Sequence, residues 1–411
     1  MTAEPIVIVG GGLASARVVE GYRGAGGEAA ITLVSADDTV PYHRPPLSKG
    51  LLRGEAEPGD ILVQPESWYE EQVVDVRLGT EVDGLDTAAR RLSLAGGGSL
   101  EYGTLVIATG ASPRTLPIPG IDLTGVHTYR RIADALAVRE AAAEARQALV
   151  IGGSFIGAEV AASLRRLGLE VTLIEMGDRL MPALSSDELS AQLADLYRAE
   201  GVELLLGERI EELRGNGRLL TGARTVSGAD LEAYLAVIGV GVQPSVGFLE
   251  ESGLELDDGI VVDERFRASA DGVYAVGDVA RFPDRVFGRP RRIEHWSNAN
   301  AQGAHLGSVL AGGRSAYDEI SVFFTELFGF KLQVLGDLDG GVDEVVLRGS
   351  VAERQLLGFY LRGGRLIGAV LAGQAADLAG EVKQLVRAQP EPLDRERLRD
   401  PSVRPSAAFA A

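Results

Sequence analysis

The sequence contains one pattern twice: a short apolar run, a glycine-rich turn, a helical segment and a second apolar run. The first copy covers residues 6–34 and the second covers residues 148–174. A strand, a glycine turn, a helix and a further strand form the beginning of a βαβ unit. Strands that alternate with helices favour a parallel, doubly wound sheet. The repeat therefore predicts an α/β chain with two Rossmann-like dinucleotide-binding domains.

A different pattern begins near Tyr317, where the glycine turns stop. Alternating runs at 344–348 and 356–361, followed by a helical segment at 375–388, indicate a separate C-terminal α+β domain. The proline-rich last stretch of roughly twenty residues indicates a loosely packed tail. The expected boundaries are residues 1–112 and 241–313 for a discontinuous first domain, 113–240 for the second and 314–411 for the third.

Cysteine is absent from all 411 residues. This excludes disulfides, thiolate zinc sites, cysteine-ligated iron–sulfur clusters and a cysteine nucleophile. Any redox chemistry must therefore use a cofactor that is held without sulfur. The 59 acidic side chains outnumber the 40 basic ones and give a net charge of −19, which argues against a nucleic-acid binder. The four histidines do not pair at ligand spacing, so we expect no metal.

The amino terminus and the length of the apolar stretches bear on where the protein is located in the cell. The amino terminus has no basic region ahead of an apolar run, so it does not indicate a signal peptide. The most apolar later stretch, residues 233–242, is too short to span a bilayer. We expect a cytoplasmic protein without a membrane partner.

The first glycine turn has the composition of a phosphate-binding turn. Such a turn needs backbone N–H groups at a helix start and little side-chain bulk beside the phosphates. Gly10 and Gly12 meet this need, while Ser15 stands where a third glycine is usual. A glycine-rich turn of purely structural purpose is the alternative. The acid that would bind the adenosine ribose is less clear, because Ala36 precedes the nearest candidate, Asp37.

The second glycine turn runs from Gly152 to Gly157, with Ser154 where the second glycine is expected. Here the acid is clear, because Glu175 ends the following strand at close to the usual interval of about 20 residues. A carboxylate there suits the ribose 2′-hydroxyl of NAD and repels the extra phosphate of NADP. Arg179 lies four residues further on and leaves NADP open, and a surface glutamate at a strand end is the structural alternative.

The loop at residues 41–49 contains three prolines, which favour a stiff, extended backbone. It carries Arg44 and Lys49, two cations that can neutralise a pyrophosphate or stabilise a reduced, anionic flavin. Taken alone, a solvated basic loop is the simpler interpretation.

Two further strand-like runs end in small residues. The run at 104–108 is followed by Thr109 and Gly110, and the run at 272–276 is followed by Gly277 and Asp278. The Asp278 carboxylate is suited to bonding a ribityl hydroxyl. Either feature alone could be an ordinary strand end.

The order of these motifs resembles that of one family. The first glycine turn, PYHRPPLSK, ATG, GGSFIGAE, VIGVGVQP and YAVGDVA follow one another, with RRIEHWSN close to the last. The chain strongly resembles the FAD-dependent, NADH-linked ferredoxin and rubredoxin reductases, the putidaredoxin-reductase-like group that supplies electrons to oxygenases. The resemblance covers roughly residues 4–313 by motif and the rest more loosely. It implies a glutathione-reductase-like architecture with the added C-terminal domain.

The resemblance also implies the residues that bind FAD. The adenine, ribose and pyrophosphate would lie along Gly10, Gly12, Leu13, Ala14, Ala36, Asp37, Arg44 and Val82. The middle of the cofactor, the ribityl chain and the ring would lie along Lys49, Thr109, Gly110, Arg131, Gly277, Asp278, Glu294, His295 and Trp296. For Trp296 a place in the core is the ordinary alternative.

NADH would dock on the second turn. The implied residues are Gly152, Ser154, Phe155, Ile156, Gly157, Glu159, Glu175 and Gly241. Glu159 would contact the nicotinamide carboxamide, and its structural alternative is an acid favoured at a helix start.

The chain departs from the family at the start of the third domain. Relatives usually carry a Trp-Ser/Thr-Asp-Gln run, where this chain has Phe324, Thr325, Glu326 and Leu327. In relatives this face lies near the flavin and the electron acceptor, so the departure bears on the acceptor.

The resemblance implies that the flavin carries the chemistry, without a catalytic side chain. Related disulfide reductases pass electrons to a cysteine pair, which this chain lacks. We therefore expect single electrons to pass to a ferredoxin-type iron–sulfur protein that supplies an oxygenase or cytochrome P450. Arg285, Arg289, Arg291 and Arg292 would form its docking patch or, alternatively, a solvated loop. A monomer or weak dimer is the family-based expectation.

Two other hypotheses stay open. The first keeps the fold and changes the acceptor, as in an apoptosis-inducing-factor-like NADH oxidoreductase that reduces a quinone, oxygen or another small oxidant. The second is a non-catalytic binding or sensor protein, for which the substituted Ser15 and Ser154 are the only support.

Overall fold

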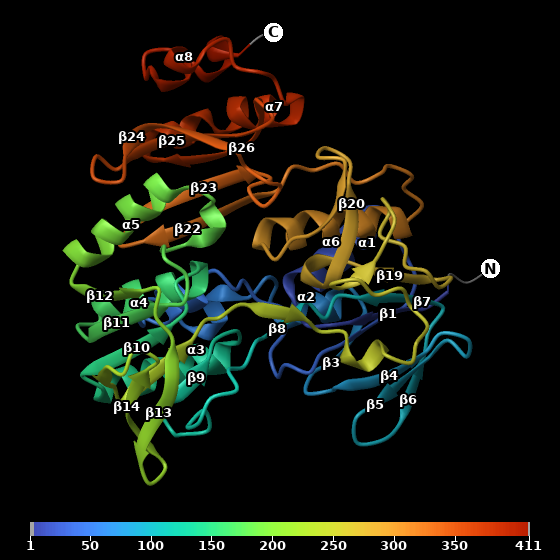
Figure 1. Ribbon diagram of the computed structural model, residues 1–411. Helices are drawn as coiled ribbons and strands as arrows, with labels where there is room; N and C mark the ends of the chain where they lie inside the picture. The colour runs from blue at the N-terminus through green and yellow to red at the C-terminus, as the bar shows by residue number, and fades with distance from the viewer. Residues whose placement is uncertain (1–3, 410–411) are drawn as a thin grey trace. The chain divides into compact units, whose positions relative to one another are not determined.

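The computed structural model describes residues 4–409, and the chain divides into two compact units (Figure 1). Of the described residues, the first unit comprises 4–44, 58–112 and 242–321. The second comprises 45–57, 113–241 and 322–409. No helix within the described range is both long and apolar enough to cross a membrane.

The first unit contains a parallel sheet in the order β19-β7-β1-β2-β3. Its central strand β1 is entirely β-branched and buried, as is usual for a strand covered on both faces. The strands of this sheet are β1 (Ile6–Val9), β2 (Ile31–Val34), β3 (Val74–Arg77), β7 (Thr104–Ile107) and β19 (Val273–Ala275). Because all five are parallel, their carboxyl ends meet at one edge, where a doubly wound sheet places its ligands.

Helices α1 (Leu13–Gly24) and α6 (Trp296–Leu310) lie side by side in this unit (Figure 1). Glycine allows their close approach, because an added Cβ at Gly303 would lie 2.4 Å from the Ala14 carbonyl oxygen. The remaining elements are α2 (Glu66–Glu71), the antiparallel ladder β4 (Val82–Asp86), β5 (Arg91–Leu94) and β6 (Ser99–Glu101), and the sheet β18 (Ile260–Val261), β20 (Ala280–Asp284) and β21 (Arg289–Arg292). Two short strands, β8 (Ala111–Pro113) and β17 (Val242–Pro244), pair with each other.

The second unit repeats the parallel arrangement, in the order β12-β11-β10-β16-β9. Its strands are β9 (Val126–Thr128), β10 (Gln147–Ile151), β11 (Glu170–Glu175), β12 (Val202–Leu206) and β16 (Leu235–Ile238). Its helices are α3 (Ile132–Glu144), α4 (Phe155–Arg166) and α5 (Asp187–Ala199), with a short helical segment η1 (Leu47–Leu51) that is kinked at Lys49, whose backbone is not helical. An antiparallel ladder is formed by β13 (Ile210–Asn216), β14 (Leu219–Thr225) and β15 (Asp230–Glu232).

The C-terminal part of the second unit is an antiparallel sheet in the order β22-β23-β26-β25-β24. Its elements are β22 (Val322–Leu327), β23 (Phe330–Gly336), β24 (Glu344–Ser350), β25 (Gln355–Arg362), β26 (Arg365–Ala372), α7 (Ala379–Ala388) and α8 (Arg395–Arg399). Together with the two parallel sheets, this confirms the predicted fold class.

The prediction of a loosely packed C-terminal tail is wrong, because the described part of this tail packs against the rest of the domain. Asp394 caps α8, and Leu398 within that helix is buried. The guanidinium of Arg348 donates to the carbonyls of Leu398, Val403 and Arg397. Phe409 packs at a centroid distance of 5.7 Å against Phe359. Prolines end helices but do not prevent burial, and the apolar side chains between them supply the packing.

Candidate functional site

The first glycine turn has a backbone that only glycine adopts without strain. Gly10 has a φ of +123°, and an added Cβ would lie 2.3 Å from the carbonyl oxygen of Ala108. Ser15, the substituted position, is fully buried, and its hydroxyl donates to the Gly10 carbonyl at 2.5 Å. The serine that stands in place of the third glycine therefore closes the turn with its side chain.

The space beside this turn fits a pyrophosphate. Gly12 precedes α1 with an extended backbone and makes no side-chain cap, so the first N–H groups of the helix remain suited to an anion. Among the described residues, an added Cβ at Gly12 would meet one neighbour within 4 Å, the Arg44 Nη1 at 3.4 Å. Open space between backbone N–H groups and a guanidinium is a good environment for phosphate oxygens. Leu13 and Ala14 begin the helix and are buried.

Two further turns lie at the same sheet edge, because β7 and β19 are the next strands along from β1. After β7, the Thr109 hydroxyl donates to the Ser245 carbonyl at 2.9 Å, and Gly110 has a φ of +69°. After β19, an added Cβ at Gly277 would lie 3.2 Å from the Cβ of Ala14. The structure thus brings the turns at Gly10, Thr109 and Gly277 together.

A buried amide holds the turn that carries Asp278. The backbone N–H of Gly277 donates to Gln302 Oε1 at 2.8 Å, and Gln302 is fully buried in α6. Gln302 in turn donates to Asn298, one helical turn earlier. Sequence reasoning missed both amides, because an Asn or Gln inside a helix has no distinctive pattern until its partner is known.

The acid after β2 is partly committed to another group. Asp37 Oδ2 accepts a hydrogen bond of 2.9 Å from the Tyr42 hydroxyl, whereas Ala36 is exposed. Arg44 lies 5.6 Å from the centre of the Tyr42 ring. Val82 begins β4 and is partly buried against the core.

The run at 294–296 leads into α6. Glu294 is exposed and pairs with Arg292 at 2.5 Å, and His295 precedes the helix. Burial lowers the pKa of His295 to about 4; Asp278 opposes this shift and Arg291 adds to it. The Trp296 Nε1–H donates to His43 Nδ1 at 2.9 Å. Burial, with a smaller effect of Arg17, lowers the pKa of His43 and favours the neutral ring that can accept this bond.

In the second unit the glycine turn has the same construction as the first. Gly152 has a φ of +107°, and an added Cβ would lie 2.4 Å from the Gly239 carbonyl oxygen. An added Cβ at Gly157 would lie 1.9 Å from the Gly152 carbonyl oxygen. Ser154 precedes α4 with an extended backbone and makes no side-chain cap, so this helix start also suits a phosphate. Gly241 has a φ of +93°.

Glu175 lies against this turn. Its Oε2 accepts from the Gly153 N–H at 2.6 Å, and its Oε1 accepts from the Gly177 N–H at 2.8 Å. Arg179 forms an ion pair with Asp187. Arg179 is the cation that could bind the extra phosphate of NADP, and it already has a carboxylate partner. This pairing favours NAD as the cofactor.

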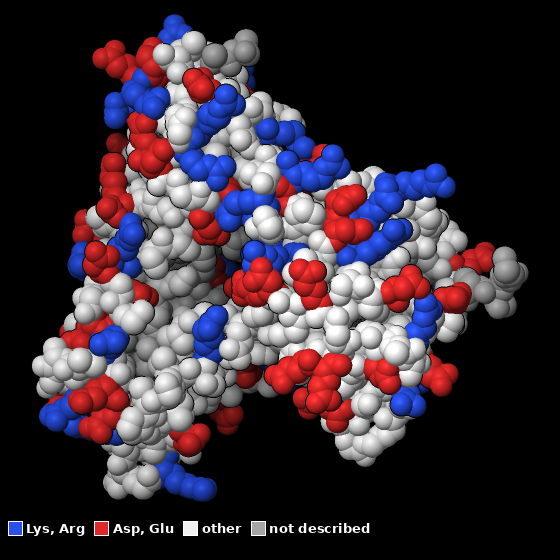
Figure 2. All heavy atoms as spheres, turned by 45° about the vertical axis from the view of Figure 1, so that its right-hand side comes forward, with Lys and Arg blue, Asp and Glu red and all other residues white. Residues whose placement is uncertain are grey.

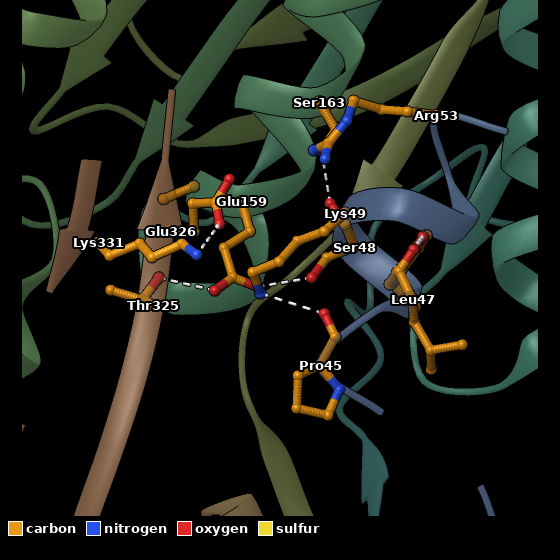
Figure 3. A network of polar contacts seen from close by, with 12 residues as sticks. Pro45, Leu47, Ser48, Lys49, Arg53, Glu159, Ser163, Thr325, Glu326 and Lys331 are labelled. Carbon is orange, nitrogen blue, oxygen red and sulfur yellow. Dashed lines mark hydrogen bonds and ion pairs between the residues drawn. The ribbon is translucent and has the colours of Figure 1, made fainter. Parts of the chain in front are cut away.

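Glu159 has partners that no sequence pattern indicated (Figure 3). Its carboxylate is buried and lies 2.6 Å from Lys49 Nζ. It also accepts hydrogen bonds from Ser48 Oγ at 2.5 Å and Thr325 Oγ1 at 2.7 Å. The structure thus brings the predicted residues Lys49 and Glu159 together within the second unit. Arg131, also in this unit, precedes α3 and is exposed.

The helix start of α4 presents two apolar side chains. Phe155 packs edge-on against Phe323 at a centroid distance of 4.9 Å. Ile156 is 45% exposed.

The arginines predicted to dock a partner differ in exposure. Arg291 is buried, pairs with Asp284 at 3.0 Å and lies over the Phe287 ring, so it is not part of an exposed patch. Arg292 pairs with Asp258 at 3.1 Å as well as with Glu294. Arg285 is exposed and Arg289 is partly exposed.

The described residues contain no group of three or more His, Asp or Glu side chains that could hold a metal ion.

Two parallel sheets, each with a glycine turn before a helix that lacks a side-chain cap, are typical of a protein that binds two dinucleotides. Comparison with known proteins agrees. A family model described as pyridine nucleotide-disulphide oxidoreductase matches residues 4–303, and one described as reductase C-terminal matches residues 322–407. The chain belongs to the pyridine nucleotide-disulphide oxidoreductase family. It is an oxidoreductase that uses FAD and NAD(H).

Curated relatives resemble the chain over nearly its whole length. The ferredoxin–NAD(+) reductase subunit of the benzene 1,2-dioxygenase system of Pseudomonas putida is 34% identical over 97% of this chain and 96% of its own. Putidaredoxin reductase CamA from the same species is 30% identical over 97% of this chain and 95% of its own.

Solved structures agree in fold. A ferredoxin reductase from Rhodopseudomonas palustris has a TM-score of 0.93 at 33% identity, covering 99% of this chain and 100% of its own. The covalent complex of putidaredoxin reductase with putidaredoxin has a TM-score of 0.93 at 30% identity, covering 98% of this chain and 97% of its own.

Proposed function

We propose that the chain takes a hydride from NADH onto FAD and passes electrons singly to a ferredoxin-type iron–sulfur protein that supplies an oxygenase or cytochrome P450. Bound FAD supplies the conversion from two-electron to one-electron transfer. The observation that carries the proposal is the lack of cysteine in a member of a disulfide-reductase family. Without an internal thiol pair, the electrons must leave to an external acceptor.

The chain's own residues bind and orient the two dinucleotides. On the FAD side, the N–H groups after Gly12 and the Arg44 guanidinium would neutralise the pyrophosphate, and Asp278 would bond the ribityl chain. On the NADH side, the α4 start would hold the pyrophosphate and Glu175 the ribose hydroxyls. Glu159 would accept from the carboxamide N–H of the nicotinamide, and Lys49 would approach the flavin ring.

The comparisons favour a ferredoxin over a small acceptor, because the relatives described above are reductases of oxygenase systems or bind putidaredoxin.

For docking we propose the surface that carries Arg285 and Arg289, since Arg291 is buried and Arg292 has two carboxylate partners. On the face visible in Figure 2, basic and acidic side chains are interspersed, so a docking surface is local. We propose that the chain is a monomer or weak dimer.

An anaerobic titration tests the hydride step. NADH is expected to bleach the visible flavin spectrum of the purified holoenzyme under nitrogen, faster than NADPH does. A colourless protein that cannot be reconstituted with FAD would refute the proposal.

Steady-state turnover then tests the acceptor, with a panel of ferredoxins compared against quinones, oxygen and a dye. We expect at least one ferredoxin to be reduced fastest. If a quinone or oxygen surpasses every ferredoxin, the acceptor is a small oxidant.

A further inference from the structure

The buried Glu159 carboxylate is held from two distant parts of the sequence (Figure 3). Lys49 and Ser48 come from η1, and Thr325 comes from β22 in the C-terminal sheet. Thr325 is 1% exposed and Glu159 is 4% exposed. The Glu159 carboxylate is therefore shielded from water, and three donors among the described residues contact it. This arrangement holds the carboxylate in one orientation.

Two side chains of helix α4 contact two side chains of strand β22. Phe155 and Glu159 are four residues apart and share one face of the helix. Phe323 and Thr325 are two residues apart and share one face of the strand. Phe155 meets Phe323, and Glu159 meets Thr325. The neighbouring Phe324 points to the other face and is 51% exposed. The apolar pair thus aligns the two elements, and the polar pair is the specific contact between them.

A second set of contacts joins the segment that carries Lys49 to helix α4. Ser163, one helical turn beyond Glu159, donates its hydroxyl to the Ser48 carbonyl at 2.6 Å. Arg53 donates to the same Ser163 hydroxyl at 3.1 Å. The segment that carries Lys49 is therefore fastened to α4 at two positions, Glu159 and Ser163, while Thr325 contacts the Glu159 carboxylate from the C-terminal sheet.

The donors divide unequally between the two oxygens. A carboxylate has about four acceptor positions, two on each oxygen. Lys49 and Ser48 both contact Oε2, whereas Oε1 accepts from Thr325. Among the described residues, Oε1 therefore keeps one acceptor position, and the Thr325 hydroxyl sets the direction in which that position faces.

We propose that Thr325 is a positioning residue for hydride transfer: it orients Glu159 Oε1 so that the carboxylate accepts the carboxamide N–H of the nicotinamide. This inference rests on the proposed function, which assigns Glu159 to the carboxamide. It gives the C-terminal domain a part in the NADH half-reaction, in addition to any part in the reaction with the acceptor.

The test uses Thr325→Val, which keeps the shape and removes the hydroxyl, and Thr325→Ser, which restores the hydroxyl. The rate of anaerobic flavin bleaching by saturating NADH is expected to fall about tenfold in Thr325→Val, the effect of losing one orienting bond to a charged group. Thr325→Ser is expected to lie within about twofold of the original chain. FAD content and thermal midpoint are measured on each holoenzyme, and Thr325→Ala replaces Thr325→Val if that variant loses FAD.

A reduced analogue with an acetyl group in place of the carboxamide distinguishes positioning from general damage. The analogue has no N–H for Glu159 to accept, so Thr325→Val should slow it less than about twofold. As a matched control, Thr225→Val removes another buried strand hydroxyl in the same unit and should leave both rates unchanged.

Three results would overturn the inference: Thr325→Val as fast as the original chain, Thr325→Ser as slow as Thr325→Val, or equal slowing with NADH and the analogue. The proposed function fails by a different result, namely no bleaching of the original chain by NADH.

Discussion

The first glycine turn depends on single residues at which a methyl group cannot be accommodated. Replacing Gly10 with alanine forces a φ of +123° on a residue with a Cβ and places that Cβ 2.3 Å from a backbone carbonyl oxygen. Backbone strain of this kind costs about 1–3 kcal/mol before the clash is counted. We expect Gly10→Ala to lose most of its bound FAD and to unfold at lower urea, measured by flavin absorbance and circular dichroism.

The control for this change is Gly24→Ala, near the end of α1. An added Cβ at Gly24 has nothing within 4 Å, and alanine favours helix. FAD content and stability should be retained or slightly improved. Equal behaviour of the two variants would contradict the requirement for glycine at the turn.

Glu175 provides the second prediction at the residue scale. In Glu175→Gln the negative charge that repels a 2′-phosphate is removed, while one oxygen remains for the backbone. We expect the preference for NADH over NADPH, as a ratio of kcat/KM values, to fall about tenfold. Glu170→Gln, at the exposed opposite end of β11, should leave the ratio unchanged. A ratio unaffected in Glu175→Gln would show that other groups decide the choice.

At the scale of elements, the start of α6 combines burial with the positive end of a helix. Both effects disfavour a charged imidazole, and burial lowers the pKa of His295 from 6.5 to about 4. Between these values the unfolded chain binds more protons at His295 than the folded chain does. The free energy of unfolding therefore falls as the pH falls from 6.5 to about 4, by up to about 3 kcal/mol from this residue.

Urea unfolding at pH 7 and pH 5 measures this effect. His295→Asn removes the titrating ring and should flatten part of the pH dependence, so the two stability curves should differ in slope over this window. Parallel curves would mean that His295 is protonated as readily in the folded chain as in the unfolded chain.

At the scale of the whole molecule, the chain has a net charge of −19 and would have to attract an acidic partner through a local surface. If docking is electrostatic, kcat/KM for a ferredoxin should fall several-fold between low and physiological salt, because exposed charges are screened. Turnover of a neutral dye should be insensitive to salt.

Charge reversal locates that surface. Arg285→Glu should lower kcat/KM for the ferredoxin and leave dye reduction unchanged. Arg91→Glu, at an exposed position in β5, is the matched control. Equal loss in both variants would indicate a general charge effect without a docking surface at Arg285.

The sequence by itself determined the two parallel sheets, the glycine turns and the C-terminal α+β domain. Each depends on local chemistry: β-branched runs form buried strands, and a turn with positive φ requires glycine. The runs expected at 344–348 and 356–361 are strands β24 and β25. Of the helix expected at 375–388, the structure has Ala379–Ala388, preceded by a 3₁₀ turn. The domain boundaries and the roles of the site residues remain predictions.

Only the tertiary structure decided which side chains meet. Ser48 and Thr325 converge on Glu159, Gln302 holds Gly277, Asp284 neutralises Arg291, and Arg348 fastens a tail that proline had predicted to be loose. These partners are separated in sequence by up to 166 residues, the interval between Glu159 and Thr325. A local pattern records the propensity of a segment, whereas the pairing of a buried polar group depends on which distant donor the packing of the fold brings within reach.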